Sequence, residues 1–331
     1  MSPRLFFALG GRALLLFAAG VFAQAPPVPL QKPHAKVWSV PRTPDGHPDL
    51  QGVWTNATIT PFERPAALSG KPVLSDSEAA AVEEQAAEGR VDQPPPPGDP
   101  GGYNQFWFDR GTKVVGTKRS SLVVDPPDGR VPALTPAAQR QQQEAAAYAA
   151  QHPADGPESR PLAERCILWG TAGPPMAPGP YNNNYQIVQG PGYVVILVEM
   201  IHDARVIPTD GRSHLPGHIR QWMGDPRGHW EGDTLVVETT NFTSKTRYRG
   251  ADENLRVVEK FRRVDADMID YQFTIDDPTA FTQPWGADIP MTRSEGTLYE
   301  YACHEGNYAM TDILAGARAQ EKARPEARRQ P

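Results

Sequence analysis

Four of the eight histidines in this 331-residue chain fall within one stretch, residues 181–242. They are His202, His214, His218 and His229. Arginines, tryptophans and carboxylates lie among them. Histidine and carboxylate side chains can exchange protons with a bound molecule, because their pKa values lie close to neutral pH or can be shifted towards it. This stretch therefore has the chain's highest density of groups able to do chemistry.

His229 and Glu231 are two residues apart, so a strand through them would point both side chains to one face. Such a pair suits an acid/base couple or two metal ligands. We expect His229 or His202 to act as the base and Glu231 to orient it. Arg205 or Arg220 would bind an anion or a developing oxyanion.

Two interpretations of the strand that leads to His202 stay open. His202 lies at a pocket rim if the apolar strand at residues 193–200 continues unbroken, or it is a hydrogen-bonded core histidine. Glu199 would need a partner if it is buried, and Arg205 and Arg220 are the candidates. Such an arginine–carboxylate pair could also be purely structural.

Two polar segments rich in tyrosine and asparagine resemble binding loops, at residues 180–185 and 301–308. A plain turn is the alternative for the first, because asparagine suits turns. The candidate substrate-binding residues are Tyr181, Asn182, Asn184, Tyr185, Glu199, His218, Trp222, His304 and Glu305.

The beginning of the chain predicts export. Residues 5–22 are largely apolar, Arg4 precedes them, and small residues follow near Ala23. We interpret residues 1–25 as a cleaved signal peptide and expect a periplasmic or secreted protein without a membrane span after cleavage. An uncleaved anchor is the alternative, although Arg12 leaves the apolar run short for a bilayer.

Cys166 and Cys303 are the two cysteines of the chain. In an exported protein, one pair suggests a single disulfide that closes a long loop. The alternative is two free thiols, with Cys303 beside His304 acting as a nucleophile. The net charge of −6 offers no basic field for nucleic acid.

The elements that must position these residues are mainly strands. Apolar or alternating runs predict strands at residues 49–55, 120–125, 186–188, 193–200, 204–207, 234–242, 255–264, 268–275 and 297–303. Their short connections, without alternating helices, indicate an antiparallel sheet that closes as a barrel or packs as a sandwich. We expect a barrel of about eight strands.

Helices are predicted mainly outside this sheet. Ser75 and Glu78 form a capping-box pattern before an alanine-rich run, and Thr135-Pro136 begins a second helix that ends near residue 151. We expect an extended lead-in at 26–48, one barrel domain at 49–317 with an insertion at 63–165, a helix near 312–320, and a disordered tail at 318–331.

The run Gly52-Val53-Trp54 resembles the opening strand of lipocalin-like (calycin) barrels. The resemblance implies that the glycine allows close approach and that the tryptophan plugs the barrel base. Longer strings resemble an uncharacterised group of exported bacterial proteins, from residue 48 to about residue 317, and imply no activity. These strings are YNNNYQIV, EMIHDAR, IRQWMGDPRGHWEGDTLVVETTNF and YEYACHEGNY.

The leading hypothesis is an exported barrel enzyme that acts on a small organic molecule by acid/base chemistry, as a lyase, isomerase or hydrolase. No Gly-x-Ser-x-Gly, P-loop, Gly-x-Gly-x-x-Gly or His-Glu-x-x-His motif is present. The alternative is a non-catalytic protein that binds a hydrophobic or aromatic molecule through Trp107, Tyr181, Tyr185, Trp222 and Trp230. No cofactor is predicted; a third hypothesis places a divalent metal on His202, His229 and His304.

Overall fold

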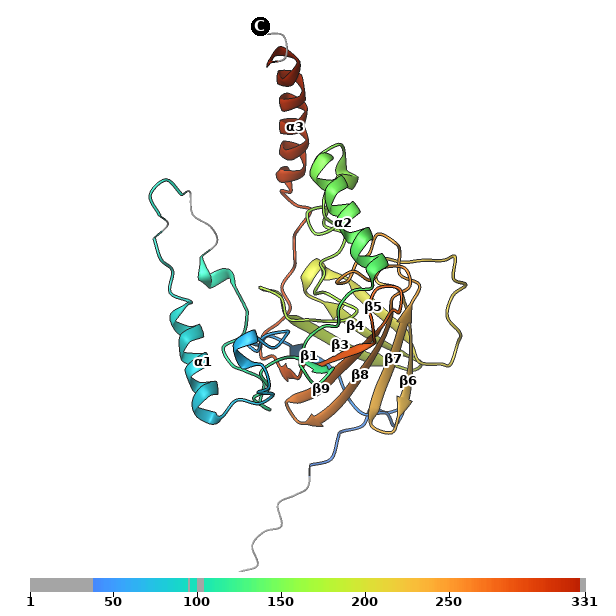
Figure 1. Ribbon diagram of the computed structural model, residues 1–331. Coiled ribbons are helices and arrows are strands. Elements are labelled where there is room, and N and C mark those ends of the chain that lie inside the picture. Colours follow the sequence, from blue (N-terminus) through green and yellow to red (C-terminus); the bar gives the residue numbers. More distant parts are fainter. Residues whose placement is uncertain (1–37, 95, 100–103, 328–331) are drawn as a thin grey trace, which may run out of the picture. The chain divides into compact units, whose positions relative to one another are not determined.

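Antiparallel strands form the core of the computed structural model, which describes residues 38–94, 96–99 and 104–327 (Figure 1). The strands are β1 (Gly52–Thr55), β2 (Val123–Asp125), β3 (Asn184–Gly190), β4 (Tyr193–Val198), β5 (Ala204–Pro208), β6 (Asp225–Glu231), β7 (Thr234–Thr240), β8 (Arg256–Asp265), β9 (Met268–Asp276), β10 (Trp285–Asp288) and β11 (Met291–Arg293). The expected signal peptide and most of the lead-in lie outside the described residues.

Nine strands form a nearly closed barrel, in the order β5-β4-β3-β1-β11-β9-β8-β7-β6. Every neighbouring pair in this order is antiparallel, and the two end strands, β5 and β6, lie close together. The lipocalin-like barrel predicted from the sequence is therefore confirmed. β2 and β10 pair with each other beside this path, and β10 also pairs with β9.

Side-chain alternation explains why these segments form strands with one buried face. In β9, Tyr271 and Phe273 are almost completely buried, whereas Gln272 and Thr274, which alternate with them, are exposed. Successive side chains of a strand point to opposite faces, so this pattern turns one face into the barrel core. The expected alternation of β9 is confirmed.

Trp54 fills the space that the Gly-x-Trp pattern predicts for it. Its ring is fully buried, its Nε1 donates a hydrogen bond to Leu50 O at 2.9 Å, and the guanidinium of Arg293 lies 4.7 Å from the ring centroid. Gly52 has φ of +135°, and a Cβ atom there would lie 2.9 Å from that guanidinium. Glycine is therefore required for the close approach of Arg293.

A buried ion pair lies in the barrel core. Arg205 on β5 binds Glu259 on β8 through both guanidinium NH groups, one of them at 3.0 Å. Tyr271 donates its hydroxyl proton to Glu259 Oε1 at 2.8 Å and accepts a hydrogen bond from Met176 N at 2.8 Å. Burial, with the negative charge of Glu259, raises the pKa of Tyr271 well above its ordinary value, so the phenol keeps its proton.

The region between β1 and β3 contains the two predicted helices, α1 (Asp76–Glu88) and α2 (Pro136–Gln151). Ser75 and Glu78 form the expected capping box, and Thr135 caps α2. Short 3-10 turns lie at Ala66–Leu68, Gln105–Trp107 and Pro157–Ser159. This region also contributes β2, which pairs with β10 of the sheet.

Two expectations for the last part of the chain differ from the structure. Residues 297–303 were expected to be a strand, but their backbone is irregular. The helix expected near residues 312–320 is longer, because α3 spans Tyr308–Ala327 and takes up most of the expected disordered tail. Arg318 donates hydrogen bonds to the carbonyl oxygens of Ala154 and Asp155, which fixes this helix.

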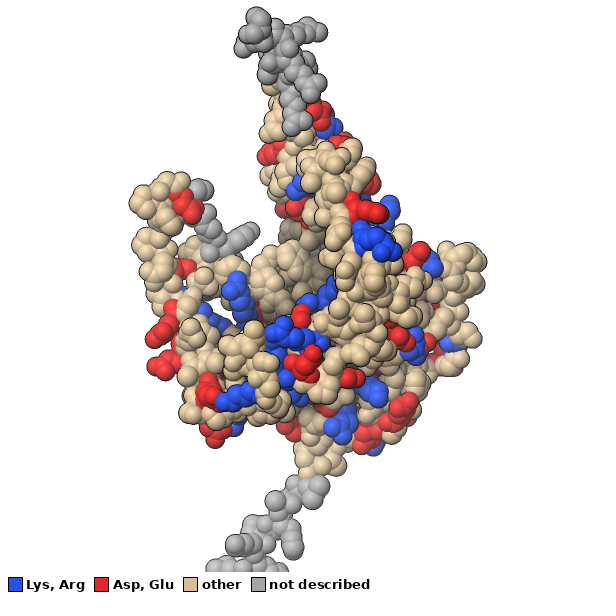
Figure 2. Space-filling model, in the orientation of Figure 1, with Lys and Arg blue, Asp and Glu red and all other residues tan. Residues whose placement is uncertain are grey.

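Charges of both signs are interspersed on the face shown in Figure 2, so this face has no broad field of one sign. In the ranges that the structure describes, no helix is long and apolar enough to cross a membrane.

Candidate functional site

A cavity of about 720 Å³ lies where β3 begins and β4 ends. Four segments contribute to it: residues 107–109, the asparagine-rich stretch at 181–184, Glu199 after β4, and the irregular segment that ends at Cys303. Its lining residues are Trp107, Phe108, Asp109, Tyr181, Asn182, Asn184, Glu199, Tyr299, Glu300, Tyr301, Ala302 and Cys303. Four of them, Tyr181, Asn182, Asn184 and Glu199, are among the predicted substrate-binding residues.

Glu199 is the most buried charged group of this cavity, with 2% of its surface exposed. Its Oε2 accepts a hydrogen bond from Asn184 Nδ2 at 2.6 Å, and its Oε1 accepts one from Tyr299 N at 3.0 Å. Neither Arg205 nor Arg220, the expected partners, makes either of these two bonds. Two neutral N–H donors instead form hydrogen bonds with the carboxylate oxygens and hold the carboxylate in one orientation.

Asp109 supplies a second carboxyl group with different surroundings. Its side chain is exposed and lines the cavity. Partial desolvation by the surrounding protein raises the pKa of the Asp109 carboxyl, the negative charge of Glu199 raises it further, and Arg90 opposes the rise. Two carboxyl groups in unlike environments are suited to separate acid and base roles.

Consecutive asparagines explain how the local sequence positions both carboxyl groups. Asn183, which is buried, accepts a hydrogen bond from Gly179 N at 2.7 Å and donates one from Nδ2 to Asp109 O at 2.5 Å. Asp109 N in turn donates to Pro180 O at 2.9 Å. Because Asn184 next to it binds Glu199, the loop is both a turn and a support for the cavity wall.

A strained turn follows Glu199 directly. The strand ends at Val198, and a 3-10 turn at Met200–His202 replaces the expected continuation. Ile201 has φ of +66° and His202 has φ of +47°, a left-handed conformation that is unfavourable for a β-branched residue. Such strain is concentrated at functional sites.

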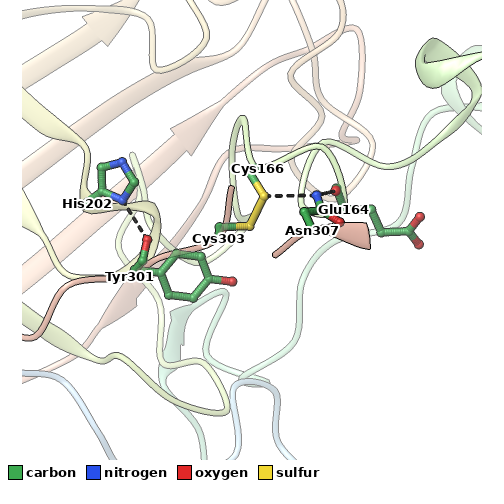
Figure 3. The surroundings of a disulfide bond; sticks show 6 residues. All are labelled: Glu164, Cys166, His202, Tyr301, Cys303 and Asn307. Carbon is green, nitrogen blue, oxygen red and sulfur yellow. Dashed lines mark hydrogen bonds between the residues drawn. A yellow bond between two sulfur atoms is a disulfide. The ribbon is translucent and has the colours of Figure 1, made fainter. Parts of the chain in front are cut away.

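The expected disulfide between Cys166 and Cys303 is confirmed, and it fixes one wall of the cavity (Figure 3). Both cysteines are used in this bond, so the hypothesis of a nucleophilic Cys303 thiol is wrong. Asn307 Nδ2 donates to Glu164 O at 2.9 Å beside it. The ring nitrogen Nδ1 of His202 lies 2.9 Å from Tyr301 O, so His202 supports the same segment through its backbone.

The predicted acid/base pair lies elsewhere. His229 Nε2 and Glu231 Oε1 are 3.0 Å apart, as the spacing indicated, but their side chains are 59% and 60% exposed. On β6 the inward positions belong to Gly228 and Trp230, so the alternation turns His229 and Glu231 outward. The pair does not line the cavity that contains Glu199.

The remaining predicted residues are dispersed. Arg205 lies in the buried ion pair, and Arg220 donates to the carbonyl oxygens of Phe242 and Glu253 at 3.0 and 2.7 Å. These two arginines and Trp222 line another cavity, of about 600 Å³, beside β5 and β6. Tyr185 is buried and accepts a hydrogen bond from Asn56 Nδ2 at 3.3 Å, whereas His218, His304 and Glu305 are exposed.

Within residues 38–94, 96–99 and 104–327, no group of three or more His, Cys, Asp or Glu side chains could hold a metal ion.

Asp109 was missed by sequence reasoning. The aromatic run that precedes it was the available signal, because such a run beside a carboxylate is a candidate pocket wall.

Comparison with known proteins found no matching family model, no matching curated protein and no matching solved structure.

Proposed function

We propose that this protein is an exported barrel enzyme that acts on a small organic molecule by acid/base chemistry in the Asp109–Glu199 cavity. The observation that supports this proposal is the placement of two carboxyl groups with unlike surroundings in one aromatic-lined cavity. Environments that separate two titratable groups in this way are typical of acid/base sites. The assignment moves the chemistry from the exposed His229–Glu231 pair to this cavity.

In this proposal Asp109 exchanges a proton with the bound molecule as the acid, because its pKa is raised towards the working pH. Glu199 accepts a proton, since its carboxylate is oriented by Asn184 and Tyr299 and each of its oxygens retains a further lone pair. The aromatic side chains would hold the substrate between the two groups. A lyase, an isomerase or a hydrolase could each use this arrangement.

Ligand binding without catalysis is the second candidate function. The five aromatic residues of the cavity favour it, because aromatic walls suit a hydrophobic or aromatic ligand whether or not a reaction follows. The enzyme proposal and the binding proposal differ in one measurable respect, which is whether the ligand leaves the protein chemically changed.

Export follows from the predicted signal peptide together with the disulfide, which persists in an oxidising compartment such as the periplasm. We therefore propose a periplasmic or secreted protein whose partner is a small molecule.

The test incubates the protein with a mixture of small metabolites and follows their conversion by mass spectrometry. Asp109→Asn and Glu199→Gln are expected to reduce conversion about 100-fold or more, as for removal of a general acid or base. Glu231→Gln is the matched control and should retain the wild-type rate. Unchanged conversion in both cavity variants would overturn the proposal, and retention of unconverted ligand would favour the binding protein.

A further inference from the structure

We infer that the Asp109–Glu199 cavity selects a small organic cation, an amine or quaternary ammonium compound with an apolar body. This inference deepens the proposed function by naming a substrate class, and it rests on that proposal only for the claim that the ligand is turned over.

The charge of the cavity wall is the first argument. Three acidic residues line the cavity: Asp109, Glu199 and Glu300. Among the described residues that line it, none is lysine, arginine or histidine. An occupant with positive charge would be attracted to this acidic wall, whereas an anion would be repelled by it at close range.

Glu199 strengthens this argument because it is buried. Taking a carboxylate out of water is costly unless charges or hydrogen bonds compensate. Its two donors, Asn184 Nδ2 and Tyr299 N, are neutral groups, so they orient the carboxylate without cancelling its charge. A cation in the cavity would supply that neutralisation.

The aromatic wall is the second argument, and it is independent of the carboxylates. Trp107 and Tyr299 are 62% and 73% exposed, and Phe108, Tyr181 and Tyr301 are half-buried beside them. Exposed aromatic side chains gathered at one cavity indicate a binding site. Their ring faces attract cations, and aromatic walls are the usual means of recognising quaternary ammonium groups.

The arginines near this cavity line a neighbouring cavity of about 670 Å³. Arg90 and Arg110 line that neighbour, and Phe108 lines both cavities. The guanidinium of Arg110 lies 4.3 Å from the centre of the Phe108 ring. The described lining of the neighbour includes no aspartate or glutamate. The Asp109–Glu199 cavity thus has an acidic lining and its neighbour a basic one, although Arg90 is close enough to lower the pKa of Asp109.

The volume limits the size of the cation. Pockets of about 300–1,000 Å³ hold ligands up to the size of drug molecules, and this one measures about 720 Å³. A trimethylammonium or protonated amine group with a ring or short chain would fit, and its apolar part would contact the aromatic residues.

The test measures binding by isothermal titration calorimetry with two matched pairs of probes. Choline and 3,3-dimethylbutan-1-ol have the same shape but differ in charge, and benzyltrimethylammonium and benzoate are aromatic ions of opposite sign. We expect each cation to bind about tenfold or more tightly than its counterpart, and added salt to reduce the difference. Equal binding within either pair, or preference for benzoate, would overturn the inference.

Variants locate the effect in the cavity. Glu199→Gln should weaken binding of benzyltrimethylammonium several-fold, and Glu300→Gln, an exposed position, provides a second variant that leaves the fold intact. Glu231→Gln, on the β6–β7 hairpin and not among the residues that line the cavity, is the matched control and should bind as the wild type does. Unchanged affinity in both cavity variants contradicts the inference.

Failure of this inference and failure of the proposed function give different results. If cations bind but none is converted, the inference of cation selection stands and the proposed enzyme function is rejected. If neutral or anionic molecules are converted, and the conversion depends on Asp109 and Glu199, the enzyme function stands and cation selection is rejected.

Discussion

Two regions of this protein hold buried carboxylates in opposite ways. In the barrel core, Glu259 is paired with Arg205 by two hydrogen bonds and receives a third from Tyr271. In the cavity at the end of the barrel, the hydrogen bonds that Glu199 accepts from described residues come from neutral N–H donors. The ion pair leaves no unpaired charge in the core, whereas Glu199 has hydrogen bonds but no cation among the described residues beside it. Under our proposal, the first arrangement is structural and the second serves a ligand.

The largest effect is expected for Arg205→Met, which leaves the Glu259 carboxylate buried without its cation. We expect the free energy of unfolding to fall by about 3–5 kcal/mol, measured by urea denaturation. Replacing both residues, Arg205→Met with Glu259→Leu, should restore much of the loss because no unpaired charge remains. Arg220→Met is the control: its guanidinium binds carbonyl oxygens at the surface, so its loss should cost only about 1 kcal/mol. Equal costs for the two arginines would remove the distinction between core and surface.

The second effect concerns the cavity wall. Replacing Cys166 and Cys303 together by serine removes a cross-link between residues 137 positions apart. We expect the free energy of unfolding to fall by about 2–4 kcal/mol, and the affinity for benzyltrimethylammonium to fall as well, because the segment from Tyr299 to Cys303 loses its anchor. Calorimetry on the folded variant measures the second part. Full retention of affinity would show that the disulfide supports the barrel alone.

The smallest effect is the pH dependence of Asp109. Its pKa is raised in the folded state, so the folded protein binds this proton more tightly than the unfolded chain, whose value is about 3.9. The contribution to stability is present below that value and is lost as pH rises through the folded-state pKa. The melting temperature of the wild type relative to Asp109→Asn should therefore rise as pH falls from 7 to 3.

Asp210→Asn provides a control of opposite sign. The pKa of Asp210 is lowered to about 2, and the largest cause is a hydrogen bond from Arg212. The stabilisation from Asp210 is present above about pH 4 and is lost as pH falls towards 2. If both variants shift in the same direction between pH 7 and 3, the raised pKa of Asp109 is contradicted.

Features that depend on neighbouring residues could be predicted from the sequence. The capping box at Ser75 and the alternation around Tyr271 are local patterns, and the structure reproduces both. The pairing of Cys166 with Cys303 followed from their number alone. The contact between His229 and Glu231 also followed from spacing, since residues two apart share a strand face.

Features that depend on tertiary arrangement could not be predicted in the same way. Which face of β6 points inward is decided by how Gly228 and Trp230 pack against the core, not by the chemistry of His229. Asp109 is brought near Glu199 by hydrogen bonds from and to a loop remote in sequence, at Asn183 and Pro180. The 3-10 turn after Val198 ended a strand whose apolar pattern continued, since the left-handed Ile201 has no local sequence signal.

The position of β1 between β3 and β11 has a consequence for how the barrel assembles in time. Trp54 is opposite both Tyr185 and Arg293, so the ladder is completed by a contact between segments far apart along the chain. Contacts of this kind form late, because a large loss of chain entropy precedes them. β1 therefore stays unpaired on one side until β11, which lies more than 200 residues later, is available to complete the ladder.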